Sequence, residues 1–214
     1  AQIFYKSNAF NGLLDWIYFT IEKFIKKDDY QILIRIHPAE SKGGFSTAQP
    51  LEKEIKNKFP ILPEHIKIIP PESDISSYSL SEVSKANIIY GTNMGLEIAA
   101  RGLPLVIAGE CYSRGKGFSY DINNKEQYLS LIEKGFELDD LIPPNQVELA
   151  RKYAYYLNFK RCVDFKSFDT PISGKNISRK MRLNFDSISS LDKGNDRGLD
   201  ILCNGIINLE KIIQ

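Results

Sequence analysis

Short β-branched segments alternate along this chain with segments of helical periodicity. Strands are predicted at residues 31–36, 66–69, 87–90 and 105–108, and helices at 10–27, 51–59, 80–85, 94–100 and 126–134. Strands that follow one another through helices pair in parallel, and parallel sheets carry helices on both faces. The expected fold class is therefore α/β, with one parallel sheet built from residues 10–134.

After residue 134 the alternation stops. Helices are predicted at 146–159 and 199–213, and the residues between them are polar and irregular. We therefore expect an α/β domain over residues 1–160, followed by an irregular segment and a C-terminal helix over 161–214 that packs on it. Four aromatic residues of the helix predicted at 146–159 are expected to pack within the protein: Tyr153, Tyr155, Tyr156 and Phe159.

The composition excludes several classes of function. A formal net charge of +1 gives no basic field that would attract nucleic acid. Three scattered cysteines indicate a reducing compartment rather than a disulfide framework, and so predict a cytoplasmic location. With two histidines and no Cys/His cluster, no metal site is predicted. No apolar run reaches the length of about 18 residues that a transmembrane helix needs.

The segment from residue 87 to residue 97 carries the clearest functional signal. The third predicted strand ends at a glycine and turns at once into a helix, with Thr92 and Asn93 in the turn and Gly95 just after it. Such a turn directs backbone N–H groups and short side chains toward a phosphate. Glu97 follows in the first helical turn, where its carboxylate could accept hydrogen bonds from a ribose. The alternative is an ordinary helix cap, for which Thr and Asn are well suited.

Polar residues also follow the first predicted strand. His37 precedes Pro38, which fixes the turn, and Arg35 lies on the same side of the strand as His37. Both side chains are candidates for contact with a phosphate. The alternatives are a histidine that caps the loop and an arginine in a structural ion pair, for example with Glu40.

Two further loops complete the set of candidates. Ser76 and Ser77 could bind phosphate oxygens, or could cap the helix that follows them. Tyr112, Arg114 and Lys116 lie on a glycine-rich loop that could close over a sugar or a pyrophosphate, or could be an exposed loop with incidental charge. Because every one of these loops follows a parallel strand, we expect them to meet at one edge of the sheet.

Together these segments resemble a known family. They are residues 35–40, 76–80, 91–100 and 102–118. In this order and spacing they resemble the donor-binding, C-terminal domain of GT-B glycosyltransferases, which is Rossmann-like. The resemblance extends to the bacterial capsular-polysaccharide biosynthesis proteins that include the Kdo transferases of capsule export. It rests on a His-Pro after a strand, a serine-rich segment, a small polar turn before Gly-Leu-Glu, and a Gly-Leu-Pro before the next strand. It covers roughly residues 10–125.

The resemblance implies a transferase that displaces a nucleotide directly from the anomeric carbon of a sugar. Ser77, Thr92, Asn93 and His37 would stabilise the leaving phosphate, with no cofactor and no metal. The donor would be linked to CMP or UDP, and the acceptor would be a glycan or a lipid-linked glycan. The catalytic base would come from an N-terminal acceptor domain that is missing here, so that the chain is expected to be a fragment. The full protein is expected in the cytoplasm, with peripheral association with the inner face of the membrane.

Two other interpretations remain open from the sequence. A nucleotide-sugar epimerase of related fold uses similar turns, and its acidic catalytic residues also lie in a second domain. A non-catalytic nucleotide-binding or scaffold module is the other interpretation, although a scaffold would not need Thr92, Asn93 and Glu97 together.

Overall fold

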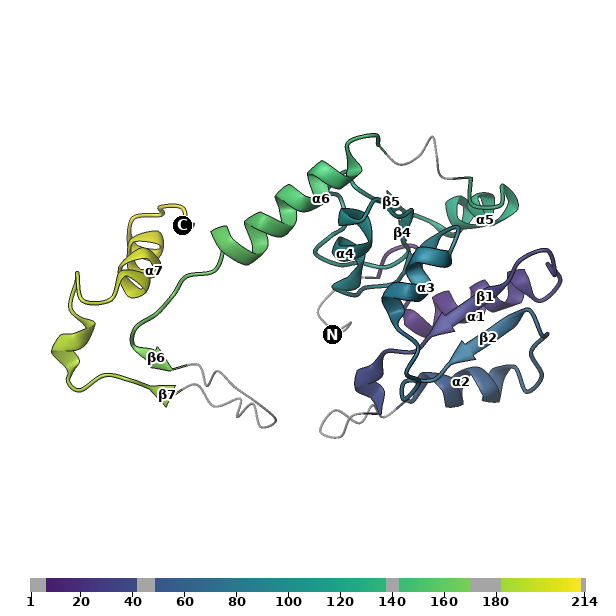
Figure 1. Ribbon diagram of the computed structural model, residues 1–214, viewed down its shortest axis with the longest axis horizontal. Helices are drawn as coiled ribbons and strands as arrows, with labels where there is room; N and C mark the ends of the chain where they lie inside the picture. The colour runs from purple at the N-terminus through teal and green to yellow at the C-terminus, as the bar shows by residue number, and fades with distance from the viewer. Residues whose placement is uncertain (1–6, 42–48, 138–142, 170–181, 213–214) are drawn as a thin grey trace. The chain divides into compact units, whose positions relative to one another are not determined.

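The computed structural model describes residues 7–41, 49–137, 143–169 and 182–212 (Figure 1). The chain divides into two compact units, residues 1–151 (unit 1) and residues 152–214 (unit 2). Across the described residues, no helix is both long enough and apolar enough to cross a membrane.

Unit 1 is an α/β structure in which helices and strands alternate. Its elements are α1 (Leu13–Phe24), β1 (Ile32–Arg35), the 3-10 helix η2 (Pro38–Glu40), α2 (Leu51–Lys58), β2 (Ile66–Ile69), α3 (Ser77–Val83), β3 (Asn87–Ile89), α4 (Met94–Ala100), β4 (Leu105–Ile107), β5 (Tyr120–Asp121), α5 (Lys125–Glu133) and the start of α6 (Gln146–Tyr155). The α/β fold class is confirmed.

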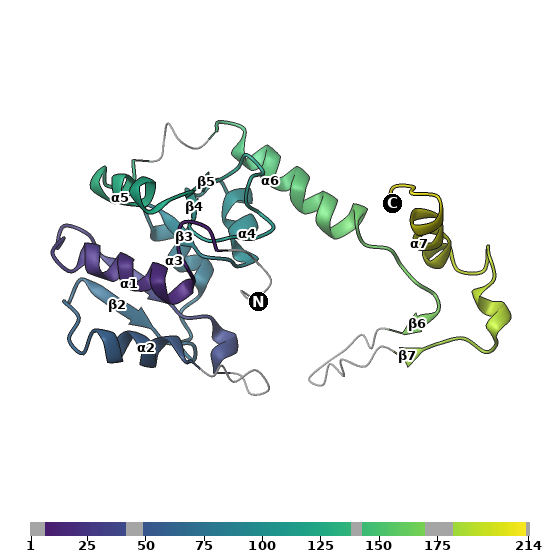
Figure 2. The same ribbon diagram turned by 180° about the vertical axis from the view of Figure 1, so that it is seen from behind.

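The strands form two small parallel sheets, whereas the sequence predicted one. β1 pairs with β2, and β3, β4 and β5 pair in that order (Figures 1 and 2). These strands are two to four residues long, so each offers few ladder positions. Side-chain packing joins the sheets instead, because Ile34 of β1 and Val106 of β4 belong to the same hydrophobic cluster.

β4 is buried on both faces, which explains its continuous apolar sequence. Val106 packs into the cluster formed with α1 and α5. On the other face, Leu105 lies beside α4, where a Cβ added to Gly95 would lie 3.6 Å from Leu105 Cδ2 and 2.4 Å from Ile89 Cδ1. Gly95 therefore allows α4 to lie against β3 and β4 at a distance that a larger residue would prevent.

An aromatic group at the centre of unit 1 joins α1 to α5. Tyr128 of α5 is fully buried and packs edge-on against Phe10, with ring centroids 5.4 Å apart. Its phenol oxygen lies 3.1 Å from Trp16 Nε1, which donates to it, and 2.9 Å from Thr20 Oγ1. Burial raises the pKa of Tyr128 to about 12, so the phenol stays protonated.

The described part of unit 2 holds one longer helix and several short elements. They are the π-helix η3 (Tyr156–Lys160), which continues α6, the antiparallel pair β6 (Phe168–Asp169) and β7 (Arg182–Leu183), the 3-10 helix η4 (Ile188–Leu191), and α7 (Arg197–Ile207). The stretch 161–196, predicted to be irregular, thus holds a strand pair and a 3-10 helix.

The prediction that the aromatic residues of the α6 region pack within the protein is wrong for three of them. Tyr155, Tyr156 and Phe159 are exposed, with 54%, 41% and 64% of their surface accessible. The aromatic spacing is that of a helix, as expected, but no described element of unit 2 covers these rings. Helical spacing alone does not reveal whether a helical face is covered.

We predict that Tyr128→Phe destabilises unit 1 by about 1–3 kcal/mol, measured as the free energy of urea unfolding. The substitution keeps the ring but leaves the buried Trp16 N–H without its acceptor. Tyr18→Phe is the matched control, because its phenol donates to the carbonyl of Glu54 from a half-buried position. Equal losses in the two variants would contradict the role assigned to Tyr128.

Candidate functional site

Arg35, the last residue of β1, is hydrogen-bonded to the backbone. The guanidinium of Arg35 donates from Nη1 to the carbonyl of Pro70 and from Nη2 to the carbonyl of Ser73, at 3.2 Å. Arg35 therefore joins the end of β1 to the loop after β2, and Glu40 instead accepts from the amide of Leu51 at 3.1 Å. The Arg35 guanidinium, which the sequence suggested for phosphate binding, is thus hydrogen-bonded to backbone carbonyl oxygens.

His37 lies at the start of η2. Its Nδ1 accepts a hydrogen bond from the amide of Ala39 at 3.1 Å, so this nitrogen is unprotonated in the described geometry. The ring is otherwise exposed, which leaves Nε2 as the edge available to a ligand. The capping role and the ligand role that the sequence left open are therefore compatible.

The serine-rich segment forms the start of α3. Ser76 is the N-cap, and its Oγ accepts from the amide of Tyr78 at 3.2 Å. Ser77 is the first helical residue and is half-buried. Of the two serines, Ser77 is the one whose hydroxyl is not used for capping in the described structure.

The turn after β3 places Thr92 and Asn93 differently. Thr92 Oγ1 accepts from the amide of Met94 at 3.4 Å, a weak local bond. Asn93 precedes the first residue of α4, its side chain makes no capping bond, and it is exposed. The side-chain amide of Asn93 is therefore available to a ligand. Gly95, by contrast, is buried against β3 and β4.

Glu97 is held in place by a residue that the sequence did not single out. The phenol of Tyr78, on α3, donates a hydrogen bond to the exposed Glu97 carboxylate, on α4. This hydrogen bond, together with the carboxylate's negative charge, raises the pKa of Tyr78. Arg101 lies over the Tyr78 ring at 4.4 Å from its centroid and pairs with Glu82 at 3.0 Å. These contacts tie α3 to α4 at the protein surface.

The loop after β4 returns to the same turn. The hydroxyl of Tyr112 donates to the carbonyl of Asn93 at 3.3 Å, and Lys116 is exposed further along the loop. Asp121 accepts hydrogen bonds from the amide of Gly115 at 2.6 Å and from the hydroxyl of Ser119 at 2.7 Å. The loop is thus anchored at both ends.

Arg114 has a structural role that its place in a charged loop did not reveal. Its guanidinium donates to the carbonyls of Ile107, Gly109 and Ile122, at 3.2, 3.2 and 2.6 Å. A fourth hydrogen bond reaches Asn123 Oδ1 at 2.7 Å. This side chain hydrogen-bonds the backbone at the ends of β4 and β5. These N–H groups are therefore already used and are not available to a ligand.

Three contacts connect the loops that the sequence predicted to meet. Arg35 joins the ends of β1 and β2, Tyr78 joins α3 to Glu97, and Tyr112 joins the loop after β4 to Asn93. The structure therefore brings the loops after β1 and β2 together, and likewise those after β3 and β4. His37 makes its described hydrogen bond only within its own turn.

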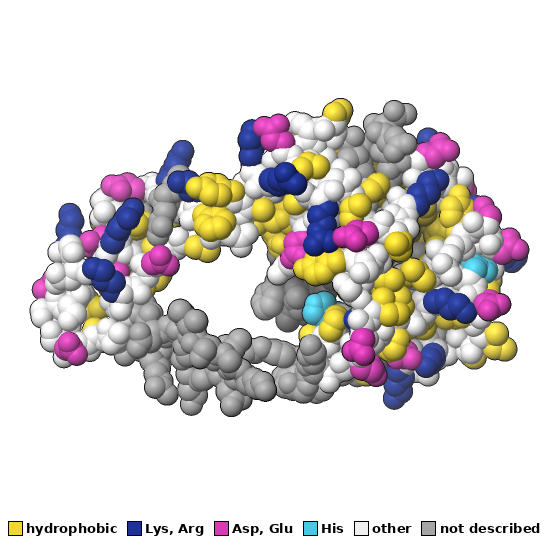
Figure 3. All heavy atoms as spheres, viewed as in Figure 1, with side chains coloured by type: hydrophobic (Ala, Val, Ile, Leu, Met, Phe, Trp, Pro, Cys, Tyr) yellow, Lys and Arg dark blue, Asp and Glu magenta, His cyan; other side chains and the backbone are white. Residues whose placement is uncertain are grey.

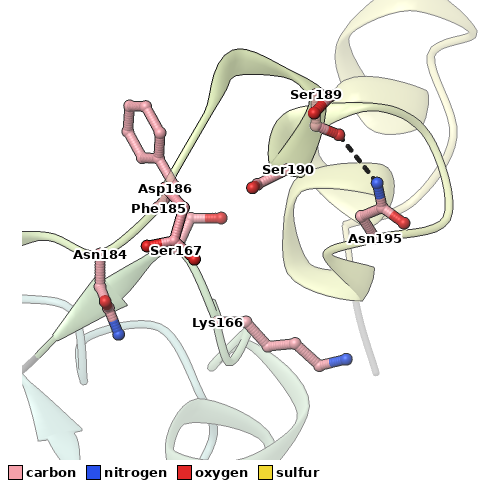
Figure 4. Close-up of a pocket in the computed structure, with 8 residues that line it drawn as sticks. All are labelled: Lys166, Ser167, Asn184, Phe185, Asp186, Ser189, Ser190 and Asn195. Atoms are coloured by element: carbon pink, nitrogen blue, oxygen red, sulfur yellow. Dashed lines mark hydrogen bonds between the residues drawn. The ribbon is translucent and has the colours of Figure 1, made fainter.

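A pocket of about 320 Å³ lies within unit 2 (Figure 4). It is lined by Lys166, Ser167, Asn184, Phe185, Asp186, Ser189, Ser190 and Asn195. The ring of Phe185 points away from the other side chains that line the pocket. None of the candidate residues from the sequence lines this pocket, and no pattern in the polar stretch 161–196 indicated it.

A buried carboxylate supports the base of that region. Asp196 Oδ2 accepts from the amide and the hydroxyl of Ser167, at 2.8 and 2.6 Å. Its Oδ1 accepts from the amides of Gly198 and Leu199, at 2.9 and 3.3 Å, and so caps α7. These hydrogen bonds, led by that from the Ser167 hydroxyl, lower the pKa of Asp196 to about 2.

Within the described ranges, no group of three or more His, Cys, Asp and Glu side chains is arranged to hold a metal ion. Comparisons with protein-family models, with curated proteins and with solved structures give no match for this chain.

We predict that Arg114→Lys lowers the unfolding free energy by about 2–3 kcal/mol, because one ammonium cannot replace the guanidinium's bonds to three carbonyls. Urea unfolding measures the change. Arg101→Lys is the matched control on an exposed arginine, with an expected loss below about 1 kcal/mol. A loss of similar size in both variants would contradict the structural role of Arg114.

We also predict a pH dependence centred on Asp196. Its folded pKa of about 2 lies below the ordinary value of 3.8, so its contribution to stability is present above about pH 4 and is lost as pH falls toward 2. The protection of the Gly198 and Leu199 amides, measured by NMR hydrogen exchange relative to the intrinsic exchange rate at each pH, should fall as pH is lowered from 5 to 2. In Asp196→Ala, which removes the oxygen that caps α7, the protection of these amides should be low throughout the range. Slow, pH-independent protection in that variant would contradict the assignment.

Proposed function

We propose that this chain is the donor-binding half of a GT-B glycosyltransferase, with a Rossmann-like fold, acting in capsular or other cell-surface polysaccharide synthesis. The proposal is supported by the order of the motifs and by the parallel strands whose loops carry them. The observation that carries it is the Tyr78–Glu97 contact, which fixes an exposed carboxylate near the turn that holds Asn93. A carboxylate so placed suits the hydroxyl pair of a ribose.

In the proposed site, the anionic side chain binds the ribose and the hydrogen-bond donors bind the phosphates. Glu97 accepts hydrogen bonds from the ribose, and Tyr78 sets the orientation of its carboxylate. Hydrogen-bond donors to the phosphates come from Asn93, Ser77, Thr92 and His37. Arg35 and Arg114 are bound to backbone carbonyls, so they contribute to the shape of the edge rather than to phosphate binding.

The proposed reaction is a direct displacement at the anomeric carbon. The acceptor hydroxyl attacks, the C–O bond to the phosphate breaks, and the nucleotide leaves with the bonding electron pair. Hydrogen-bond donors at the leaving phosphate stabilise the negative charge that develops on it. The base that takes the acceptor's proton would belong to an N-terminal acceptor domain. The full enzyme would act in the cytoplasm on a glycan or a lipid-linked glycan, with a donor linked to CMP or UDP.

We predict that this chain binds one of CMP, UDP, GDP and ADP in a calorimetric titration, and that Glu97→Gln weakens the binding about tenfold or more. The reason is the loss of a charged acceptor for the ribose hydroxyls, since such bonds contribute about 1.5–3 kcal/mol. Tyr78→Phe should weaken binding less, because the carboxylate remains but is no longer held by the phenol.

Glu64→Gln is the matched control, because Glu64 is an exposed carboxylate whose one described ion pair, with Lys67, is long at 3.9 Å. It should bind the nucleotide as the unmodified chain does. Absence of binding by all four nucleotides, or equal affinity in Glu97→Gln and Glu64→Gln, would contradict the proposed site.

A further inference from the structure

The helix that opens unit 2 exposes large aromatic rings. α6 passes directly into the π-helix η3, so residues 152–160 are continuously helical; with the next residue, Arg161, they are here called the aromatic–basic segment. Tyr155, Tyr156 and Phe159 each expose at least two fifths of their surface. Burying rings of this size is strongly favourable, so a cluster of exposed rings indicates a surface with a partner.

The rings are arranged in pairs along the segment. Tyr155 and Phe159 stack with centroids 5.2 Å apart, and Tyr153 and Tyr156 stack at 6.5 Å. Lys160 Nζ lies 6.0 Å from the centre of the Tyr155 ring. Tyr155 and Phe159 are four residues apart, a spacing at which side chains meet on a helix, so the two rings form one continuous apolar surface.

The charge of the segment has a single sign. Lys152, Lys160 and Arg161 are exposed, and the sequence contains no Asp or Glu from residue 152 to residue 163. Hydrophobic and basic side chains lie next to one another over α6 (Figure 3). The chain as a whole has a net charge of +1, so this local excess of cations is not part of a general basic field.

We propose that the aromatic–basic segment docks on an anionic phospholipid surface. Tyrosine rings with a polar hydroxyl settle at the boundary between headgroups and acyl chains. Lysine and arginine place their apolar stems beside the rings and their charges on lipid phosphates. The segment lies in the plane of the surface, as an amphipathic interfacial helix does. This inference stands independently of the proposed nucleotide site.

The test is flotation of the whole chain with two kinds of vesicle, phosphatidylcholine alone and phosphatidylcholine mixed with phosphatidylglycerol. We expect binding to the mixed vesicles that weakens as salt is raised. Replacing all three cations by Gln should lower the partition coefficient about a hundredfold, since each contributes about a fivefold attraction. Tyr155→Ser with Phe159→Ser should lower it about tenfold or more.

Two control variants match these changes elsewhere on the chain. Gln at Lys53, Lys56 and Lys58 removes three exposed lysines of α2, and Ser at Ile206 and Ile207 removes two exposed apolar residues of α7. Both controls should float as the unmodified chain does, and circular dichroism should show that all variants keep their helix content.

Three results would overturn the proposal. They are no flotation with the mixed vesicles, equal flotation with neutral vesicles, and flotation that the cation and aromatic variants leave unchanged. Binding of a single-stranded oligonucleotide or of an acidic protein by the aromatic–basic segment, without vesicle binding, would also overturn it.

Discussion

The architecture of unit 1 depends on how the backbone carbonyls at the strand ends are satisfied. Strands of two to four residues stop abruptly, and a buried carbonyl without a donor costs about 1–3 kcal/mol. Arg35 supplies donors to two carbonyls beyond β2, and Arg114 supplies donors to three around β4 and β5. With five N–H groups in a fixed plane, arginine is the side chain best suited to this task. At this edge of the sheets, the two arginines are therefore already hydrogen-bonded to backbone carbonyls.

That constraint changes how the candidate site is to be understood. A phosphate site built on free arginines would be strongly cationic, whereas this edge offers an amide, hydroxyls, a histidine and a carboxylate. The exposed carboxylate of Glu97 would repel an isolated phosphate, yet it suits a ligand that carries hydroxyl groups at a distance from its phosphate. The arrangement thus favours a ligand with both kinds of group over a simple anion.

Local pattern predicted much of unit 1. The strand at residues 66–69 and the helix at 94–100 were predicted with the bounds observed, because β-branched runs and glycine–proline stops mark them clearly. α3 begins at Ser77, three residues before the prediction, because Ser76 acts as its N-cap rather than as part of a polar loop. β5 was missed, since two residues carry no periodicity. The division into two sheets depends on tertiary packing, which no local pattern encodes.

The site was predicted only in its outline. Positions after strands could be found from the sequence, and Asn93, Glu97 and His37 are indeed exposed there. The partners could not be found, because Tyr78 reaches Glu97 from a different helix and the donors of Arg114 point inward to the backbone. In unit 2 the buried residues among those described are Ser167, Asp196 and Gly198, so hydrogen bonds and not an apolar core organise that region. Hydrophobic periodicity is uninformative about such a structure.

Trp16 gives the protein an intrinsic optical label. It is the chain's one tryptophan, it is buried in unit 1, and its indole nitrogen donates to Tyr128 while its ring lies 5.6 Å from that of Tyr90. Tryptophan emission therefore reports the integrity of the core between α1 and α5, and it is silent about unit 2. Far-ultraviolet circular dichroism reports the helices of both units. The difference between the unfolding midpoints measured by fluorescence and by circular dichroism therefore shows whether the units unfold in one cooperative transition.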